Sequence, residues 1–189
     1  MKPTQEELKW IWRYSYSRTS LLEAHEWIDV LGQIDPKSPQ IGALTCAIVI
    51  AYARPFTQSQ ISQTERVVPL SGVSPPSHLS ATHETVLELR NKVMGHKDAT
   101  PAKGDTATPN KILIKRDETG FDLSTIVFEG IALNKRGELK SLCSHFVAHC
   151  EARTRTLIEP YRSEIMQQPL GVYELLVTES HNDWIRPLK

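Results

Sequence analysis

Apolar side chains recur every three or four residues along the first part of the chain, the spacing that places them on one face of a helix. Thr4 followed by Glu7 is a capping box, a pattern that begins helices, and Gly32 is typical of a helix end. The pattern therefore predicts a long amphipathic helix from Thr4 to Leu31. Its expected apolar stripe consists of Leu8, Ile11, Trp12, Tyr16, Leu21, Trp27, Ile28 and Leu31.

A second, more apolar segment predicts a helix from Ser38 to Arg54. Ser38 can cap it, Pro39 fits its first position, and Pro55 ends it. Because the segment is apolar on most faces, we expect it to lie at the centre of the core. The polar stretch that follows, residues 56–77, contains prolines and a glycine and predicts a surface loop.

A third helix is predicted to begin near Ser77 or Ser80, either of which can cap it, and to end at Gly95. A loop is expected over residues 99–110. Beyond it, Ile112–Arg116 and Leu123–Phe128 flank a short turn and predict a β-hairpin.

Asn134 is expected to cap a last long helix over about residues 135–167, which Pro160 kinks or breaks. Residues 172–177 predict one more strand. The fold class is therefore mainly α: a helical bundle of about four main helices with a small antiparallel β-hairpin or strand appendage. We expect a single domain over residues 1–189, with the hairpin inserted at about 111–129. The apolar stripe of the last helix consists of Leu139, Leu142, Cys143, Phe146, Cys150 and Leu157.

The 189 residues include 22 basic and 22 acidic side chains, so the formal net charge is zero. Nucleic acid can then be bound only through a local basic patch. The N-terminal residues lack an apolar signal segment, and the longest apolar run, residues 41–53, is too short to cross a bilayer. We therefore expect a cytoplasmic protein with no membrane association.

Arg90, Asn91 and His96 form the segment that points to chemistry. Arginine binds phosphate oxygens through two parallel hydrogen bonds, and histidine can both take and give a proton near neutral pH. Together they can hold a phosphodiester and move the proton of a neighbouring 2′-hydroxyl without a metal ion. Because six helical residues turn by about 240°, Arg90 and His96 can meet only if the helix ends near Gly95 or a second subunit completes the site.

The motif Arg90-Asn91-x4-His96 at the end of a helix resembles the signature of the HEPN superfamily, helical-bundle proteins of prokaryotic defence and toxin systems. The run Ala51–Phe56, at the end of the apolar helix upstream, is similar to a segment of HEPN-like bacterial proteins. The resemblance covers roughly residues 41–98. It implies a metal-independent endoribonuclease without a cofactor, in which two subunits pair so that two arginine–histidine pairs line one cleft.

The resemblance also implies partners and residue roles. The partners are RNA, a second copy of the chain, and an antitoxin or defence-system protein. The implied catalytic residues are Arg90, Asn91 and His96, and the implied substrate-binding residues are Arg54, Lys92 and Lys97.

The aromatic residues of the first helix cover more than one of its faces. Their role is therefore either core packing or a contact between subunits. They are Trp10, Trp12, Tyr14 and Tyr16.

These residues also have ordinary structural interpretations. Arg90 could be a solvated helix-end arginine, and His96 could bond the last carbonyls of its helix. Arg54 could cap its own helix or pair with Glu84 or Glu88. The chain would then be a non-catalytic HEPN-like dimeric module that binds a partner protein or a nucleotide. A regulator or antitoxin subunit is disfavoured by the neutral charge.

A metal site on the last helix is the remaining alternative. His145 and His149 are one helical turn apart, with Cys143 and Cys150 nearby, but both cysteines fall on the apolar stripe. Four ligands from one helix cannot surround a metal ion tetrahedrally. We therefore expect no metal.

Overall fold

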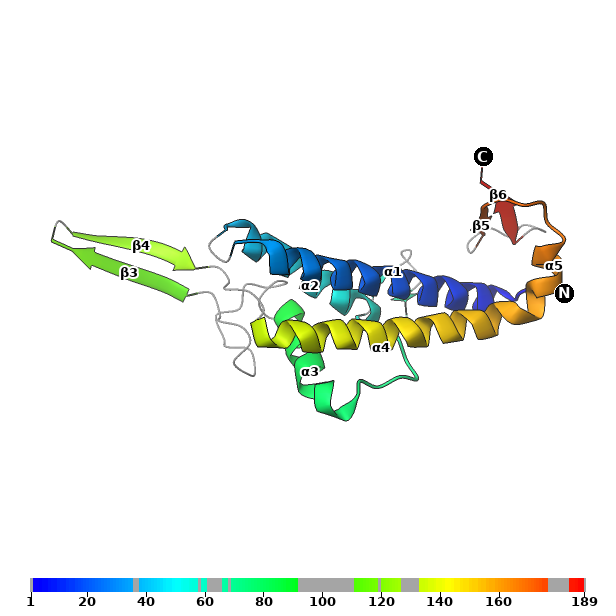
Figure 1. Ribbon diagram of the computed structural model, residues 1–189, viewed down its shortest axis with the longest axis horizontal. Coiled ribbons are helices and arrows are strands. Elements are labelled where there is room, and N and C mark those ends of the chain that lie inside the picture. The colour runs from blue at the N-terminus through cyan, green and yellow to red at the C-terminus, as the bar shows by residue number, and fades with distance from the viewer. Residues whose placement is uncertain are drawn as a thin grey trace.

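The protein is a mainly α bundle with a β-hairpin at one end, as the sequence predicts (Figure 1). The computed structural model describes residues 2–35, 38–57, 59–60, 66–67, 69–91, 111–118, 120–126, 133–176 and 184–188. Helices α1 (Gln5–Gln33) and α4 (Leu133–Ile158) lie side by side along the length of the bundle, and α2 (Gln40–Ala53) packs against α1. Helix α3 (Ser80–Leu89) packs against both α2 and α4.

Helix α1 begins at the predicted capping box. The Thr4 hydroxyl accepts a hydrogen bond from the Glu7 amide at 3.2 Å, and the Glu7 carboxylate accepts one from the Thr4 amide at 2.7 Å. The predicted end at Gly32 is wrong, because the helix continues to Gln33 and only Ile34 turns to an extended backbone. Gly32 keeps the helical conformation, so its freedom to adopt positive φ is not used.

The buried face of α1 differs from the predicted stripe. Tyr14 is only 4% exposed, whereas Tyr16 is 40% exposed and Trp12 is half-buried. Trp12 and Tyr16 instead stack on each other, with ring centroids 5.2 Å apart. Since α1 packs against both α2 and α4, its buried arc is wider than a single stripe and takes in polar side chains such as Ser17.

Helix α2 enters the core mainly through its C-terminal half and is less central than predicted, because it packs chiefly against α1 and leaves Ile50 40% exposed. Its Ile48, Val49 and Tyr52 are completely buried. The Ser38 hydroxyl accepts a hydrogen bond from the Gln40 amide at 3.3 Å. The α-helix ends at Ala53, and Pro55 lies in the 3-10 turn η1 (Arg54–Phe56) that follows.

The stretch predicted to be only a loop contains a short antiparallel pair, β1 (Ser59–Gln60) and β2 (Arg66–Val67). Neither predicted serine cap of α3 is used. The 3-10 turn η2 (Ser77–Leu79) leads directly into α3, and the Ser80 hydroxyl donates to the Pro76 carbonyl at 3.4 Å. A continuous turn supplies backbone acceptors, so α3 needs no side-chain cap.

Helix α4 starts at Leu133, so the prediction that Asn134 caps it from outside is wrong. Its predicted break is confirmed: the helix ends at Ile158, and Pro160 lies in the 3-10 turn η4 (Glu159–Tyr161) before the short α5 (Arg162–Met166). Five residues of its predicted stripe are completely buried, and Leu157 is half-buried. The five are Leu139, Leu142, Cys143, Phe146 and Cys150.

Two further strand pairs lie at opposite ends of the bundle (Figure 1). The predicted hairpin consists of β3 (Lys111–Asp117) and β4 (Gly120–Ile126), which pair antiparallel and project away from the helices. At the other end, β5 (Tyr173–Leu175) confirms the predicted tail strand, and it pairs with β6 (Ile185–Pro187), which was not predicted.

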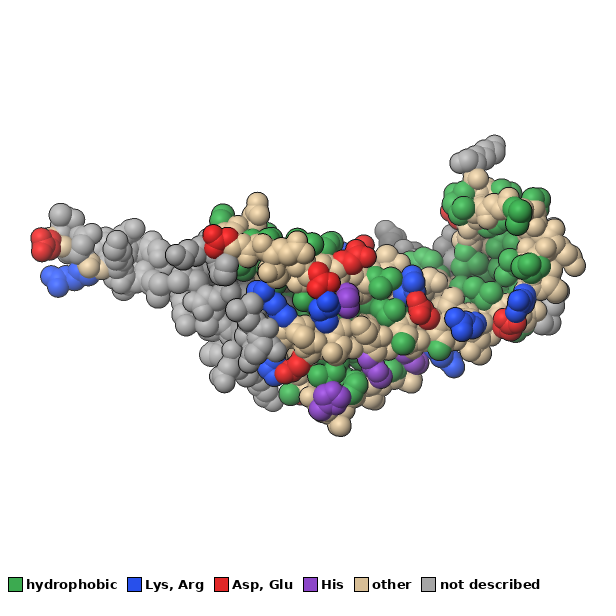
Figure 2. Space-filling view, in the orientation of Figure 1, with side chains coloured by type: hydrophobic (Ala, Val, Ile, Leu, Met, Phe, Trp, Pro, Cys, Tyr) green, Lys and Arg blue, Asp and Glu red, His purple; other side chains and the backbone are tan. Residues whose placement is uncertain are grey.

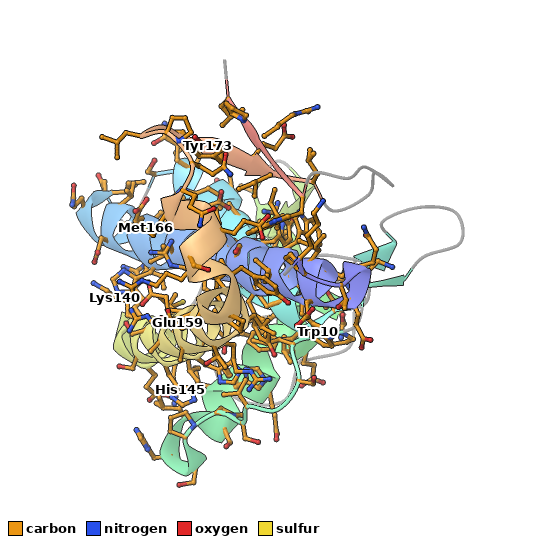
Figure 3. The ribbon with its side chains drawn as sticks, turned by 90° about the vertical axis from the view of Figure 1, so that its right-hand side faces the viewer. Trp10, Lys140, His145, Glu159, Met166 and Tyr173 are labelled. Atoms are coloured by element: carbon orange, nitrogen blue, oxygen red, sulfur yellow. The ribbon has the colours of Figure 1, made fainter. Side chains whose placement is uncertain are left out.

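A small second core attaches the C-terminal strands to the bundle. Leu8 of α1, Tyr161 of η4 and Trp184 are buried together there. Figure 3 labels Met166 and Tyr173 in this C-terminal part, and Figure 1 shows α5, β5 and β6 beyond the end of α4. No helix within the described ranges is both long enough and apolar enough to cross a membrane.

Candidate functional site

Arg90 and Asn91 lie at the C-terminal end of α3, where the helix widens into a π-type turn. The preceding Leu89 is completely buried and Val86 nearly so, which fixes the end of the helix against the core. Arg90 is half-buried and Asn91 is exposed. Such wide turns are frequent at functional sites because they redirect the side chains that follow.

The Arg90 guanidinium is oriented by its neighbour. Its Nη1 donates a hydrogen bond of 3.0 Å to the side-chain carbonyl of Asn91. Among the residues that the structure describes, no carboxylate pairs with Arg90. Arginine carries five N–H donors, so one neutral hydrogen bond leaves its charge and most of its donors available to a phosphate.

His96, Lys92 and Lys97 lie outside the described residues. Their roles as general acid–base and substrate-binding residues stay predictions.

Arg54 lies in η1 and has a carboxylate partner. Its Nη1 is 3.5 Å from Oε2 of Glu23 on α1, where the sequence offered Glu84 or Glu88 as candidates. Both side chains are exposed, at 44% and 41%. An exposed pair at this distance contributes little to stability, so a phosphate can compete with Glu23 for the guanidinium.

The segment that carries Arg54 packs against the beginning of α3, while the Arg54 side chain itself points to Glu23 of α1. Tyr52 and Phe56, on either side of Arg54, both contact His83 of α3. Arg90 is seven residues further along, which corresponds to about 10 Å of helical rise.

The run Ala51–Phe56 is the point where the four main helices meet. The Tyr52 hydroxyl lies 2.7 Å from Nδ1 of His83, and the ring of Phe56 lies 4.7 Å from that of Phe146 on α4. The Pro55 carbonyl accepts two hydrogen bonds, one from the Leu70 amide at 2.7 Å and one from an arginine of α1. The packing of the four helices at this junction explains most of the residue types in the run Ala51–Phe56.

That arginine is Arg13, which the sequence reading missed. It is only 4% exposed, and its Nη2 donates to the Pro55 carbonyl at 2.6 Å. Burial lowers its pKa, while Tyr16 and Cys150 oppose the shift. The guanidinium binds the carbonyl of η1, the turn that continues the end of α2, and the helix dipole favours a cation there, so we assign Arg13 a structural role. Arg13 lies one turn before Ser17 on the same buried side of α1, and Ser20 follows one turn later. This helical spacing is the sequence feature that could have indicated its burial.

The histidines of α4 face different partners. His145 Nε2 lies 3.0 Å from the Ser74 carbonyl, and the His149 ring meets the edge of Tyr14. Burial raises the pKa of the Cys143 thiol to about 12 and that of Cys150 to about 11, so both stay protonated. No cluster of three potential metal ligands occurs within the described part of the chain.

The face formed by α1 and α4 carries charges of both signs (Figure 2). Lys140 pairs with Asp29 at 2.6 Å, and Arg18 pairs with Glu151 at 2.7 Å, so ion pairs cross between the two helices. This neutralised surface offers no continuous basic track for a nucleic acid backbone.

Comparisons of the chain with protein-family models, with curated proteins and with solved structures find no match. Function is therefore inferred from its own residues.

Proposed function

We propose that this protein is a metal-independent endoribonuclease of the HEPN type. The observation that carries the proposal is the Arg90 guanidinium, oriented by Asn91 at the end of α3 and without a carboxylate partner among the described residues. The mainly helical bundle supports it as well, because the HEPN-like motif implies such a fold.

In this mechanism His96 takes the proton of the 2′-hydroxyl, and the 2′-oxygen forms a bond to phosphorus. The bond from phosphorus to the 5′-oxygen breaks, and that oxygen receives a proton. The products are a 2′,3′-cyclic phosphate and a 5′-hydroxyl. Arg90 neutralises the charge that develops on the phosphoryl oxygens, and Asn91 acts as a positioning residue for Arg90.

The substrate-binding part of the proposal is electrostatic. Arg54, Lys92 and Lys97 bind phosphates on either side of the scissile one. The Arg54 guanidinium leaves its ion pair with Glu23 and binds an RNA phosphate instead. Two subunits pair so that two arginine–histidine sets line one cleft. We expect sedimentation to find a dimer, and an antitoxin or defence-system protein is the expected regulator.

Cleavage of a labelled RNA by single variants tests the mechanism. We expect Arg90→Ala and His96→Ala each to reduce cleavage by about a hundredfold or more, and Arg90→Lys to restore little, because lysine cannot donate two parallel hydrogen bonds. The control is Arg155→Ala, which removes an exposed arginine from α4. The free energies of unfolding of all variants should lie within about 1 kcal/mol of that of the parent protein.

Unchanged cleavage by the His96→Ala protein would overturn this proposal. A parent protein that cleaves no RNA would favour the non-catalytic interaction or nucleotide-binding module instead.

A further inference from the structure

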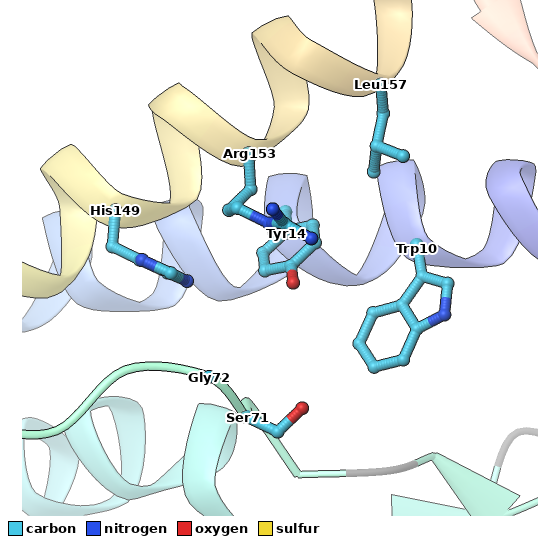
Figure 4. Close-up of a pocket in the computed structure, with 7 residues that line it drawn as sticks. All are labelled: Trp10, Tyr14, Ser71, Gly72, His149, Arg153 and Leu157. Atoms are coloured by element: carbon cyan, nitrogen blue, oxygen red, sulfur yellow. The ribbon is translucent and has the colours of Figure 1, made fainter.

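A pocket of about 410 Å³ lies between α1, α4 and the loop that precedes α3 (Figure 4). Its volume falls within the range of clefts that bind small organic molecules. It contains none of the residues proposed for RNA cleavage, and it combines aromatic with basic side chains.

One wall of the pocket is aromatic. Trp10 and Tyr14, one turn apart on α1, stack with ring centroids 5.6 Å apart and planes inclined by 29°. Tyr14 is buried in the core, which fixes its ring, while Trp10 is half-buried. Figure 3 labels Trp10 on the side of α1 along which the loop before α3 passes. An indole in this position can stack with a flat ring of a ligand.

The second wall is a stripe on α4. His149, Arg153 and Leu157 follow one another at four-residue spacing and line the pocket together. The Arg153 guanidinium carbon lies 5.9 Å from the centre of the Tyr14 ring. Within the described ranges Arg153 has no carboxylate partner, so its charge is available to an anion.

His149 adds an unsatisfied polar group to this wall. Its Nε2 is buried and has no hydrogen-bond partner within the described part of the chain. Burial lowers the pKa of His149, and the charges of Arg153 and His145 lower it further. The imidazole is therefore neutral near pH 7, and the positive charge of the pocket comes from Arg153.

The third wall is a backbone segment held at both ends. The Leu70 amide bonds to the Pro55 carbonyl at 2.7 Å, and the Ser74 carbonyl lies 3.0 Å from Nε2 of His145. Between these anchors, Gly72 has a φ of 77°, which favours glycine over any other residue. The pocket is thus formed before a ligand arrives.

We propose that this pocket binds a nucleoside monophosphate, with the base stacked on Trp10 and the phosphate on Arg153. An aromatic platform next to a guanidinium that has no carboxylate partner in the described ranges suits a flat ring linked to an anion. Such a site binds the two linked parts more tightly than either part alone. The same chemistry occurs at the end of an RNA strand. This inference does not depend on the proposed ribonuclease activity.

Titration calorimetry on the full chain tests the proposal with five probes: AMP, UMP, adenosine, inorganic phosphate and a short oligoadenylate with a 5′-phosphate. We expect AMP or UMP to bind saturably at up to millimolar concentration. Adenosine and inorganic phosphate should each bind at least about tenfold more weakly, or not at all. An oligoadenylate that binds much more tightly than AMP would identify an RNA end as the source of the same base and phosphate.

Variants locate the binding. Arg153→Gln and Trp10→Leu should each weaken AMP or UMP binding by about tenfold. Ser71→Trp, at an exposed position of the third wall, should block the pocket. Arg155→Gln is the matched control, since it makes the same change two residues away and outside this pocket. The absence of mononucleotide binding, equal binding of adenosine, or unchanged affinity in the folded Arg153→Gln protein would overturn the proposal.

Discussion

The hydroxyl oxygen of Tyr52 lies 2.7 Å from Nδ1 of His83, and this contact joins the last turn of α2 to the beginning of α3. Tyr52 is completely buried, and burial raises its pKa well above the usual range. The hydroxyl therefore stays protonated, and the tautomer of His83 decides which of the two groups donates in this hydrogen bond. Phe56 and Phe146 surround the pair, with ring centroids 4.8 and 5.5 Å from His83.

Replacing Tyr52 with phenylalanine removes this hydrogen bond and keeps the ring. We expect Tyr52→Phe to lower the free energy of unfolding by about 1 kcal/mol, the usual net value of such a bond. Urea denaturation measures the change. Tyr16→Phe is the matched control, because Tyr16 is 40% exposed on the surface of α1. Equal losses in the two variants would contradict the importance of the Tyr52–His83 contact.

The same pair makes stability depend on pH. Burial lowers the pKa of His83 below 6.5, and the nearby Glu84 opposes this shift only in part. Below pH 6.5 the unfolded chain therefore binds more protons than the folded one, and stability is lost as the pH falls through the folded pKa. His149 shifts in the same direction.

We expect the free energy of unfolding to be lower at about pH 5.5 than at about pH 7.5, and the difference to be smaller in His83→Gln. The carboxyl groups of Glu7, Asp29 and Glu138 have lowered pKa values, so their contribution is lost only at more acidic pH. Denaturation curves at the two pH values provide the comparison. A His83→Gln protein with the full pH dependence would refute this assignment.

Two substitutions of Arg13 distinguish the contribution of its buried charge from that of its side-chain volume. Arg13→Ala should lower the free energy of unfolding by about 2–4 kcal/mol, because it removes the bond to the Pro55 carbonyl and leaves a cavity. Arg13→Met fills the space without burying a charge, and the Leu70 amide still bonds to that carbonyl, so its cost should be much smaller. Thermal or urea unfolding of both variants measures the difference; a methionine as costly as alanine would argue against this account.

Asn91 is expected to influence cleavage through Arg90. In Asn91→Asp, a carboxylate replaces the neutral acceptor 3.0 Å from the guanidinium and repels the phosphate. We expect kcat/KM for RNA cleavage to fall by about tenfold or more. Asn91→Ser, which adds no charge, should lose less. If the aspartate variant is as active as the parent, Asn91 does not position Arg90 for catalysis.

The proposed ribonuclease activity should survive EDTA. The mechanism uses the 2′-hydroxyl as nucleophile and protein side chains for charge and proton transfer, so the product should end in a 2′,3′-cyclic phosphate. Gel analysis of products with and without phosphatase distinguishes this end from a 3′-hydroxyl. Cleavage that requires magnesium would exclude the mechanism even if RNA were cut.

The candidate site was only partly accessible to sequence reasoning. The motif predicted a helix that carries Arg90 and ends at Gly95. The α-helix α3 ends at Leu89, Arg90 and Asn91 continue it as a π-type turn, and Gly95 lies outside the described residues. The motif could not reveal that Arg54 turns to Glu23 on α1, since nothing in the spacing of residues 23 and 54 links them. The same holds for the pocket beside Trp10.

The sequence by itself determined the main helices, the hairpin and some of the helix ends. Helical periodicity, the capping box at Thr4 and the break at Pro160 depend on residues a few positions apart, so they can be read along the chain. The tertiary structure alone decided which side chains meet across 42 residues at Arg13 and Pro55, or 31 at Tyr52 and His83. Those contacts depend on how helices cross and which rotamers fit between them, and neither leaves a periodic signal in the sequence.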